Sequence, residues 1–335
     1  MLGDGASGRK GSSLAERVAS RMAAGTLVSL HKAPAPAAPP VVPIEPEFFP
    51  ATPAPMVSAT PVPMVAKLAA VVEKSPEPEK FSEPAASTPP IHINLHRLKS
   101  AGVVTPDSPR SVNTEEFRVI KRYLMKIAFP EDPATRIKNS NVIMVTSSIP
   151  GEGKTFTSLN LAMSFSMERN LYILLVDADN HRHSLSAMIE ADISNVGLID
   201  LLVDHSLHMR DIIFHTDIPN LSFIPAGRPH PQATELLSSK DMATLIGELA
   251  SRYPDRLIII DTPPLLASTE GAVLSSHVGH AVVVVEKDRT PKRSLQRTLE
   301  MLDGCQNVSC ILNMDTTEHS FSQYAYGYGN ASEKK

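Results

Sequence analysis

A glycine-containing segment, Ser148–Thr155 of sequence SIPGEGKT, constrains the fold of this chain more than any other feature. An apolar run typical of a buried strand, Val142–Ser147, precedes it, and a segment with helical periodicity, Thr155–Glu168, follows it. In this setting backbone N–H groups and a helix N-terminus can surround a phosphate, and Lys154 in an exposed loop supplies a cation. The sequence therefore predicts a phosphate-binding loop, although Ser148 stands where the common pattern begins with glycine. The alternative, a glycine-rich turn with a surface lysine, does not account for the flanking strand and helix.

Short apolar runs continue to alternate with helical segments after this loop. Further strands are predicted at Leu171–Asp177, Leu221–Pro225, Leu257–Asp261, Ala281–Glu286 and Val308–Asn313. Further helices are predicted at Glu235–Arg252 and Pro291–Leu302. This alternation predicts an α/β fold of the P-loop NTPase type, with a doubly wound, mostly parallel sheet and helices on both faces. Ligands of such sheets bind at the carboxyl ends of the strands.

The prolines divide the chain into regions of different character. More than half of the 29 prolines lie between positions 34 and 90, in a stretch of Pro, Ala, Val and Glu without a helical or alternating period. Such a composition cannot bury enough apolar surface to offset the entropy of ordering. We therefore expect a short amphipathic helix in residues 1–25, a disordered Pro/Ala-rich linker in 26–90, a nucleotide-binding domain in 91–313 and a flexible tyrosine-rich tail in 314–335.

The N-terminal helix is expected from apolar residues that recur every four positions, at Leu14, Val18 and Met22. Such a helix either contacts a partner or a membrane surface, or stays solvated, because isolated helices of this length are marginally stable in water.

Composition also excludes several classes of function. A net charge of −4 gives no overall basic field, so nucleic-acid binding is not expected. The two cysteines, Cys305 and Cys310, lack the spacing of a metal site and are expected to be buried thiols in a reducing cytoplasm. No apolar run approaches the ~20 residues that span a bilayer, and the N-terminus has no apolar signal core.

Carboxylates follow two of the predicted strands, at Asp177 and Asp179 and at Asp261. Adjacent parallel strands end at the same edge of a sheet, so these oxygens can hold Mg²⁺ directly or through water. One of them can also accept a proton from a nucleophile. A single aspartate at a strand end is as often a helix cap, but three near Lys154 favour a catalytic site.

Three of the six tyrosines, Tyr324, Tyr326 and Tyr328, alternate with small residues in the sequence QYAYGYG at 323–329 near the C-terminus. A flexible terminus makes them accessible as phosphate acceptors. The alternative is an aromatic tail that packs on the domain, and the phosphate-binding loop favours the acceptor role over it.

Three motifs and this tyrosine cluster together resemble the bacterial tyrosine kinases of polysaccharide export. The motifs are PGEGKT at 150–155, LLVDAD at 174–179 and IDTPP at 260–264, which look like the family's Walker A, Walker A′ and Walker B sequences. The resemblance, from about Thr114 to Gly329, implies an ATP-dependent tyrosine autokinase with Mg²⁺ on Thr155, Asp179 and Asp261.

The resemblance also implies the roles of the remaining site residues. Lys154 would contact the transferred phosphate, and Asp177 would activate the acceptor tyrosine. Asn313 is similar to the family's adenine-side residue. Nucleotide contacts are expected at Pro150, Gly151, Glu152, Gly153, Lys154, Thr155, Phe156 and Asn313.

A narrower group, the autokinases of exosortase-linked exopolysaccharide loci, is similar in layout and in the sequences EFRVIK at 116–121 and PAGRPHP at 225–231. In that group the membrane-spanning chain-length subunit is a separate protein. The resemblance therefore implies a kinase that regulates exopolysaccharide polymerisation and export from the inner face of the cell membrane through such a partner. His181 departs from the arginine that many relatives carry in the Asp177 motif.

A helix predicted at Asn113–Phe129, capped by Asn113 or Thr114 and ended by Pro130, carries an oligomerisation motif of the family. Glu115, Arg118 and Lys121 are spaced by three and share a face, which is either a subunit contact or a solvated charged surface. The resemblance implies a ring, although Lys121 cannot reproduce the bidentate hydrogen bonding of the usual arginine.

Two other functions remain open. An ATPase of the cell-division-site or plasmid-partition type would share the fold, but its second lysine early in the loop is replaced here by the sequence IPGE at 149–152. A nucleotide-binding scaffold of the export complex without phosphate transfer would not require the tyrosine cluster.

Overall fold

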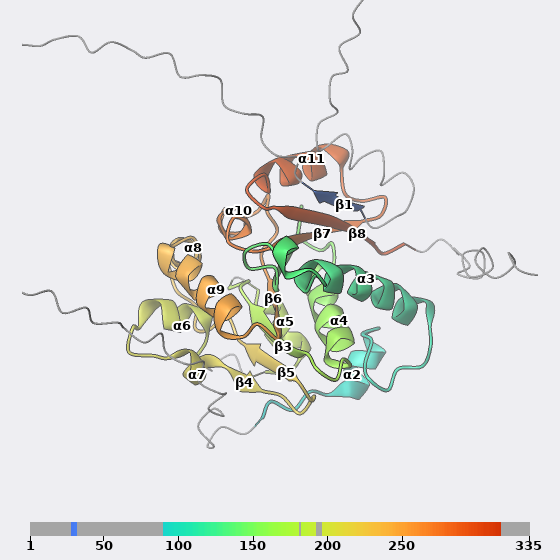
Figure 1. Ribbon diagram of the computed structural model, residues 1–335, viewed down its shortest axis with the longest axis horizontal. Helices are drawn as coiled ribbons and strands as arrows, with labels where there is room; N and C mark the ends of the chain where they lie inside the picture. The colour runs from blue at the N-terminus through green and yellow to red at the C-terminus, as the bar shows by residue number, and fades with distance from the viewer. Residues whose placement is uncertain (1–27, 32–89, 181, 192–195, 316–335) are drawn as a thin grey trace, which may run out of the picture. The chain divides into compact units, whose positions relative to one another are not determined.

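The computed structural model describes residues 28–31, 90–180, 182–191 and 196–315 of the chain (Figure 1). Its strands form one sheet in the order β1-β8-β7-β2-β6-β3-β5-β4. They are β1 Val28–His31, β2 Val142–Ser147, β3 Tyr172–Asp177, β4 Phe214–His215, β5 Leu221–Ile224, β6 Arg256–Asp261, β7 His280–Glu286 and β8 Asn307–Asn313. The helices are α2 Leu95–Ser100, α3 Val112–Ala128, α4 Lys154–Ser166, α5 Ser184–Met188, α6 Leu198–Val203, α7 Met209–Ile212, α8 Ala233–Leu237, α9 Lys240–Arg252, α10 Glu270–Ser275 and α11 Lys292–Met301, with a 3-10 turn, η1, at Pro133–Thr135.

The six central strands are parallel, which confirms the predicted fold. Only β1 and β4, at the two edges, pair antiparallel to their neighbours. The register of β3 and β6 places Asp177 opposite Asp261, so the two predicted carboxylates share one edge of the sheet.

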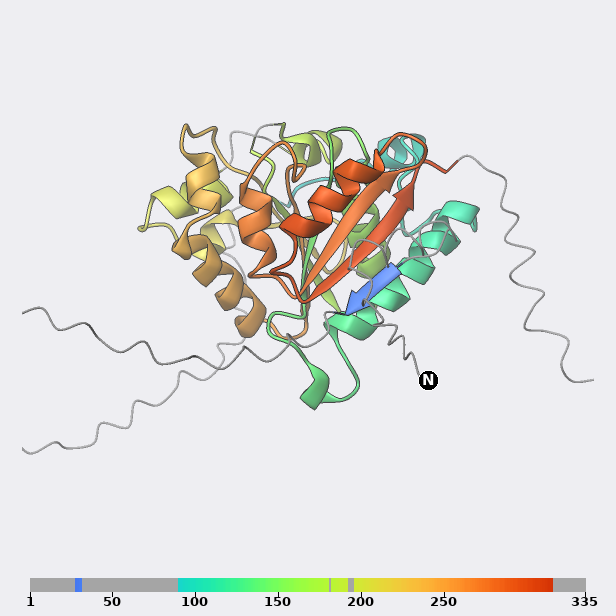
Figure 2. The same ribbon diagram turned by 90° about the horizontal axis from the view of Figure 1, so that it is seen from above.

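Helices cover both faces because the central strands are apolar on both sides. Alternate residues of β2 divide between two cores: Ile143 and Val145 face the core built with α3 and α4. Val142 and Met144 face the core built with α9, α10 and α11. Figure 2 shows α11 lying over β7 and β8 on that second face. The carboxyl ends of the strands are thus framed by helices on either side.

Helix α3 begins earlier than the sequence predicts. Ser111, not Asn113 or Thr114, is its N-cap, and the Ser111 side chain accepts a hydrogen bond from the backbone N–H of Thr114. The helix packs against α4 through Phe117 and Leu124 and the residues around them.

Two other predictions differ from the structure. The single helix predicted at Glu235–Arg252 is divided into α8 and α9, because the Ser239 side chain caps α9 through the N–H of Met242. Strand β1 lies in the segment predicted as a disordered linker and pairs with the outer edge of β8. The rest of that linker and the predicted N-terminal helix lie outside the described residues. Of the helices in the described ranges, none is long and apolar enough to cross a bilayer.

Candidate active site

The predicted phosphate-binding loop connects β2 to α4 and depends on two glycines in the left-handed region. Gly151 has a φ of +94° and Gly153 a φ of +91°, which side-chain-bearing residues rarely adopt. A Cβ on Gly153 would also lie 2.1 Å from Nδ2 of Asn313. The loop therefore exposes backbone N–H groups to a ligand at the start of α4, as phosphate binding requires.

Lys154 is buried, with a relative exposure of 8%, so the prediction that it lies in an exposed loop is wrong. It is the first residue of α4, and its Nζ lies 2.6 Å from Oδ2 of Asp179 and 3.8 Å from Oδ2 of Asp261. Burial alone would lower the pKa of Lys154, but the charges of Asp261 and Asp179 outweigh it and raise the pKa. The ammonium group of Lys154 thus stays charged between two carboxyl groups that are buried from solvent.

Asp261 ends β6 and accepts hydrogen bonds from two hydroxyls of α4. Thr155 Oγ1 donates to its Oδ2 at 2.8 Å, and Ser158 Oγ donates to its Oδ1 at 3.0 Å. Burial raises the pKa of Asp261, against the opposing charge of Lys154 and the two hydroxyl donors. The role of Ser158 was missed from the sequence, although its position one turn beyond Thr155 on the same helix face could have indicated it.

Asp177 ends β3 and is fully buried. Its Oδ1 accepts the N–H of Asp179 at 3.0 Å, and its Oδ2 accepts the Ser186 hydroxyl at 3.4 Å. Burial, reinforced by the charge of Asp261, raises the pKa of Asp177 to about 8. The nucleotide-free site thus holds three carboxyls against one buried cation.

The residues present fit a hard divalent cation. All candidate ligands are oxygens, and the local excess of carboxylate charge is what Mg²⁺ would neutralise. Within the described ranges, however, no three His, Cys, Asp or Glu side chains are arranged to hold a metal by themselves. A metal here would need the Thr155 hydroxyl and oxygens from water or from a nucleotide phosphate, as Mg²⁺ sites commonly do.

Comparison with known proteins gives the family. Residues 140–310 match the family model described as an AAA domain. The tyrosine-protein kinase YwqD of Bacillus subtilis is 30% identical over 229 residues, which cover 68% of this chain and 90% of YwqD. The chain belongs to the bacterial tyrosine-protein kinase family. Narrower membership in the exosortase-linked group is not established by these similarities.

The relatives differ in the fraction of their own length that aligns with this chain. The tyrosine-protein kinase Wzc of Salmonella typhimurium is 32% identical over 248 residues, but only 32% of its length is covered. Among solved structures, the kinase domain of the Escherichia coli tyrosine kinase ETK aligns with a TM-score of 0.56 and 26% identity over 64% of this chain and 80% of that domain.

The side chain of Glu152 in the phosphate-binding loop is fully buried and forms hydrogen bonds that hold the loop together. Its Oε2 accepts the N–H of Ile149 at 2.9 Å, and its Oε1 accepts the hydroxyl of Thr290 from the β7–α11 connection. Its carbonyl accepts Nδ2 of Asn313 at 2.9 Å. Thr290 was missed from the sequence because nothing local links it to residue 152.

Phe156 and Pro150 contact different parts of the chain. The Phe156 ring is partly buried against the core shared by α3 and α4, near Gly102. Pro150 faces the β7–α11 connection, where its carbonyl accepts NH2 of Arg289 at 3.5 Å. A nucleotide contact for either residue stays a prediction.

The three residues of the predicted oligomerisation motif have different surroundings. Arg118 NH1 donates to Glu115 Oε1 at 2.7 Å within α3, and both side chains are partly exposed. Lys121 instead points to the end of α4, where its Nζ contacts the Ser164 carbonyl at 3.2 Å and Glu168 Oε1 at 2.7 Å. Only two of the three side chains thus interact solely within α3.

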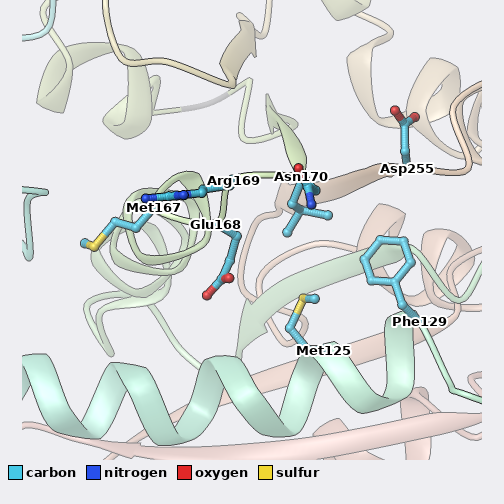
Figure 3. Close-up of a pocket in the computed structure, with 8 residues that line it drawn as sticks. Met125, Phe129, Met167, Glu168, Arg169, Asn170 and Asp255 are labelled. Atoms are coloured by element: carbon cyan, nitrogen blue, oxygen red, sulfur yellow. The ribbon is translucent and has the colours of Figure 1, made fainter.

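A separate surface pocket lies at the other end of the sheet. Figure 3 shows Met125 of α3 and Phe129, the residue that caps its C-terminus, facing residues that follow α4, with Asp255 across from them. Leu171 and Asp255, which line it, directly precede β3 and β6, whereas the phosphate-binding loop follows β2. The pocket is therefore no part of the predicted nucleotide site. Tyr324, Tyr326, Tyr328 and His181 lie outside the described residues.

Proposed function

We propose that this chain is an autokinase that transfers the γ-phosphoryl group of Mg-ATP to tyrosines of its own C-terminal tail. The observation that carries the proposal is the grouping of Lys154 with Asp177, Asp179 and Asp261 at the phosphate-binding loop. Phosphoryl transfer requires mainly positioning and charge stabilisation, and this group supplies both beside the phosphate-binding loop.

ATP would lie against the loop at 150–155, with Thr155, Asp179 and Asp261 holding Mg²⁺. The metal, when bound, neutralises charge that develops on the phosphate oxygens. Lys154 would exchange its contact with Asp179 for the transferred phosphate, which the rotatable bonds of its long side chain allow. Asn313 would border the base, next to the carbonyl of Glu152.

Asp177 would take the proton of the acceptor tyrosine. The tyrosine oxygen forms a bond to the γ-phosphorus, the bond from that phosphorus to the ADP oxygen breaks, and the phenolic proton passes to the Asp177 carboxylate. Tyrosine needs this help because its ordinary pKa is ~10. A carboxyl whose pKa is about 8 is a stronger base than an ordinary aspartate, once it is ionised.

The finer biological assignment also belongs to the proposal. The kinase would act in exopolysaccharide polymerisation and export, as a ring of subunits held at the inner face of the cell membrane by a separate membrane-spanning chain-length subunit. Support comes from the sequence resemblance and from the near-complete coverage of YwqD, in contrast to the one-third coverage of Wzc.

Incubation of the purified chain with labelled Mg-ATP, followed by mapping of phosphotyrosine, tests the function. We expect label on Tyr324, Tyr326 or Tyr328 and none in a chain with all three changed to phenylalanine. ATP hydrolysis without phosphotyrosine would instead indicate a partition-type ATPase. Nucleotide binding with neither hydrolysis nor transfer would indicate a scaffold.

A further inference from the structure

The last described residues, Asn313–Asp315, are tied to the phosphate-binding loop and to the β7–α11 connection. Asn313 donates to the carbonyl of Glu152, and its own carbonyl accepts the N–H of Lys287 at 3.0 Å. Two residues further, Asp315 Oδ1 accepts Nζ of Lys287 at 2.6 Å. The side chains of this pair are only 22% and 26% exposed, so the ion pair is partly shielded from water.

Between these two attachments the backbone takes an uncommon conformation. Met314 has a φ of +59° while its side chain is 51% exposed. The left-handed region is unfavourable for a side-chain-bearing residue, and it persists where the surroundings hold the chain on both sides. Asn313 and Asp315 provide those two attachments.

The connection that binds Asp315 is also the one that binds the phosphate-binding loop. Thr290 donates to Glu152, and Arg289 contacts the carbonyl of Pro150. The charge of Asp315 also acts on helix α3, where burial raises the pKa of Glu116 and Asp315 adds to the rise. Asp315 thus contacts the connection that supports the nucleotide loop, and its charge also acts on the predicted oligomerisation helix.

We infer that Lys287 and Asp315 are positioning residues that fix the root of the tyrosine tail beside the nucleotide site. The inference rests on the proposed function, because it concerns how the acceptor tyrosines are delivered. From Asp315 to Tyr324 the extended chain spans up to ~30 Å. A fixed root shortens the free tether and sets its starting direction, which raises the effective concentration of tail tyrosines at sites within that reach.

The test compares the attached tail with the same tail supplied as a free peptide. Lys287→Gln and Asp315→Asn are each assayed for tail phosphorylation, and then, with Tyr324, Tyr326 and Tyr328 changed to phenylalanine, for phosphorylation of a synthetic peptide of residues 320–331. We expect the ratio of tail to peptide rates to fall by about 1.4-fold or more, because the free tether to Tyr324 lengthens from roughly 9 to 11 residues and also loses its fixed starting direction. The reversed pair, Lys287→Asp with Asp315→Lys, should restore the ratio.

Lys292→Gln is the matched control, since Lys292 is exposed in the first turn of α11 and carries the same charge change. It should leave the ratio unchanged. An unchanged ratio in both single variants would overturn the inference. So would an equal fall in tail and peptide rates, because the pair would then act through the nucleotide site.

Hydrogen exchange separates this inference from the proposed function. In the nucleotide-free chain, Lys287→Gln should speed exchange of the backbone amides at 314–316, whereas Lys292→Gln should not. This readout needs no kinase activity. If wild type labels neither tail nor peptide, the proposed function fails, but the exchange result still shows whether Lys287 and Asp315 hold this part of the chain. Unchanged exchange in Lys287→Gln would refute the inference.

Discussion

At the scale of single residues, Asp177 combines a chemical role with a cost in stability. Its folded pKa of about 8 lies above the ~3.9 of an unfolded chain, so the folded state holds a proton that the unfolded state has released between those values. Stability should therefore fall as the pH rises from about 4 to about 8. The carboxyl is retained against this penalty, which is typical of functional groups.

Asp177→Asn should stabilise the nucleotide-free, metal-free chain while it abolishes transfer. The amide keeps an acceptor for the N–H of Asp179 and removes the charge beside Asp261. We expect the variant's Tm to exceed that of wild type by about 2–4 °C for each kcal/mol of destabilisation that the substitution removes. The gap should widen from pH 5 to pH 9 in differential scanning calorimetry, with ATP affinity in Mg²⁺ largely kept. A gap independent of pH would contradict the assignment of the raised pKa.

Lys154→Met should lose both transfer and stability, because Lys154 is buried between Asp179 and Asp261. Removal of one phosphate contact commonly costs about 10²–10³ in rate. Removal of one partner from a buried ion pair commonly costs about 3–5 kcal/mol of folding free energy. Lys154→Arg, which keeps the charge, should recover stability more than transfer in parallel melting and labelling assays. A Lys154→Met chain with wild-type rate and Tm would refute both roles.

At the scale of elements, the β7–α11 connection braces the phosphate-binding loop through Thr290. Thr290→Val leaves Oε1 of buried Glu152 without its hydroxyl donor, which commonly costs about 1–3 kcal/mol. We expect ATP affinity, measured by calorimetry, to fall severalfold, because the loop loses its fixed shape. Thr290→Ser keeps the hydroxyl and should bind as wild type does. Equal affinity in the valine variant would mean that the brace has no effect on the nucleotide.

The elements also show how far the sequence could predict the structure. The parallel strands were predictable to within a residue at nearly every end, because buried runs such as Ile258–Ile260 leave little alternative. The loop and its carboxylates followed from their places at strand ends. The burial of Lys154 and the brace by Thr290 depend on contacts between distant segments, which no local pattern encodes. The break at Ser239 is a local N-cap, which the serine three residues before Met242 could have indicated.

At the scale of the whole molecule, the proposed ring depends on which side chains of α3 are available to a neighbouring subunit. Lys121 has a side chain only 12% exposed and is paired with Glu168 of its own chain. Arg118 and Glu115 are more exposed and are paired with each other, so they can exchange partners across an interface at smaller cost. We therefore expect Arg118→Ala to reduce the oligomer seen by light scattering, and Lys121→Ala to lower Tm more than association. The reverse pattern would assign the contact to Lys121.

Phosphorylation between subunits is the consequence we expect of such an oligomer. A Lys154→Met chain that keeps its tyrosines, mixed with an active chain whose Tyr324, Tyr326 and Tyr328 are phenylalanine, should become labelled. Arg118→Ala in both chains should reduce that label, because the donor site and the acceptor tail then meet less often. Each phosphotyrosine adds about −1.5 to −2 charges, so full modification should repel the tail from the carboxylates of the site and loosen the assembly. If the inactive chain stays unlabelled while wild type labels itself, transfer occurs within one subunit and the ring is not required for it.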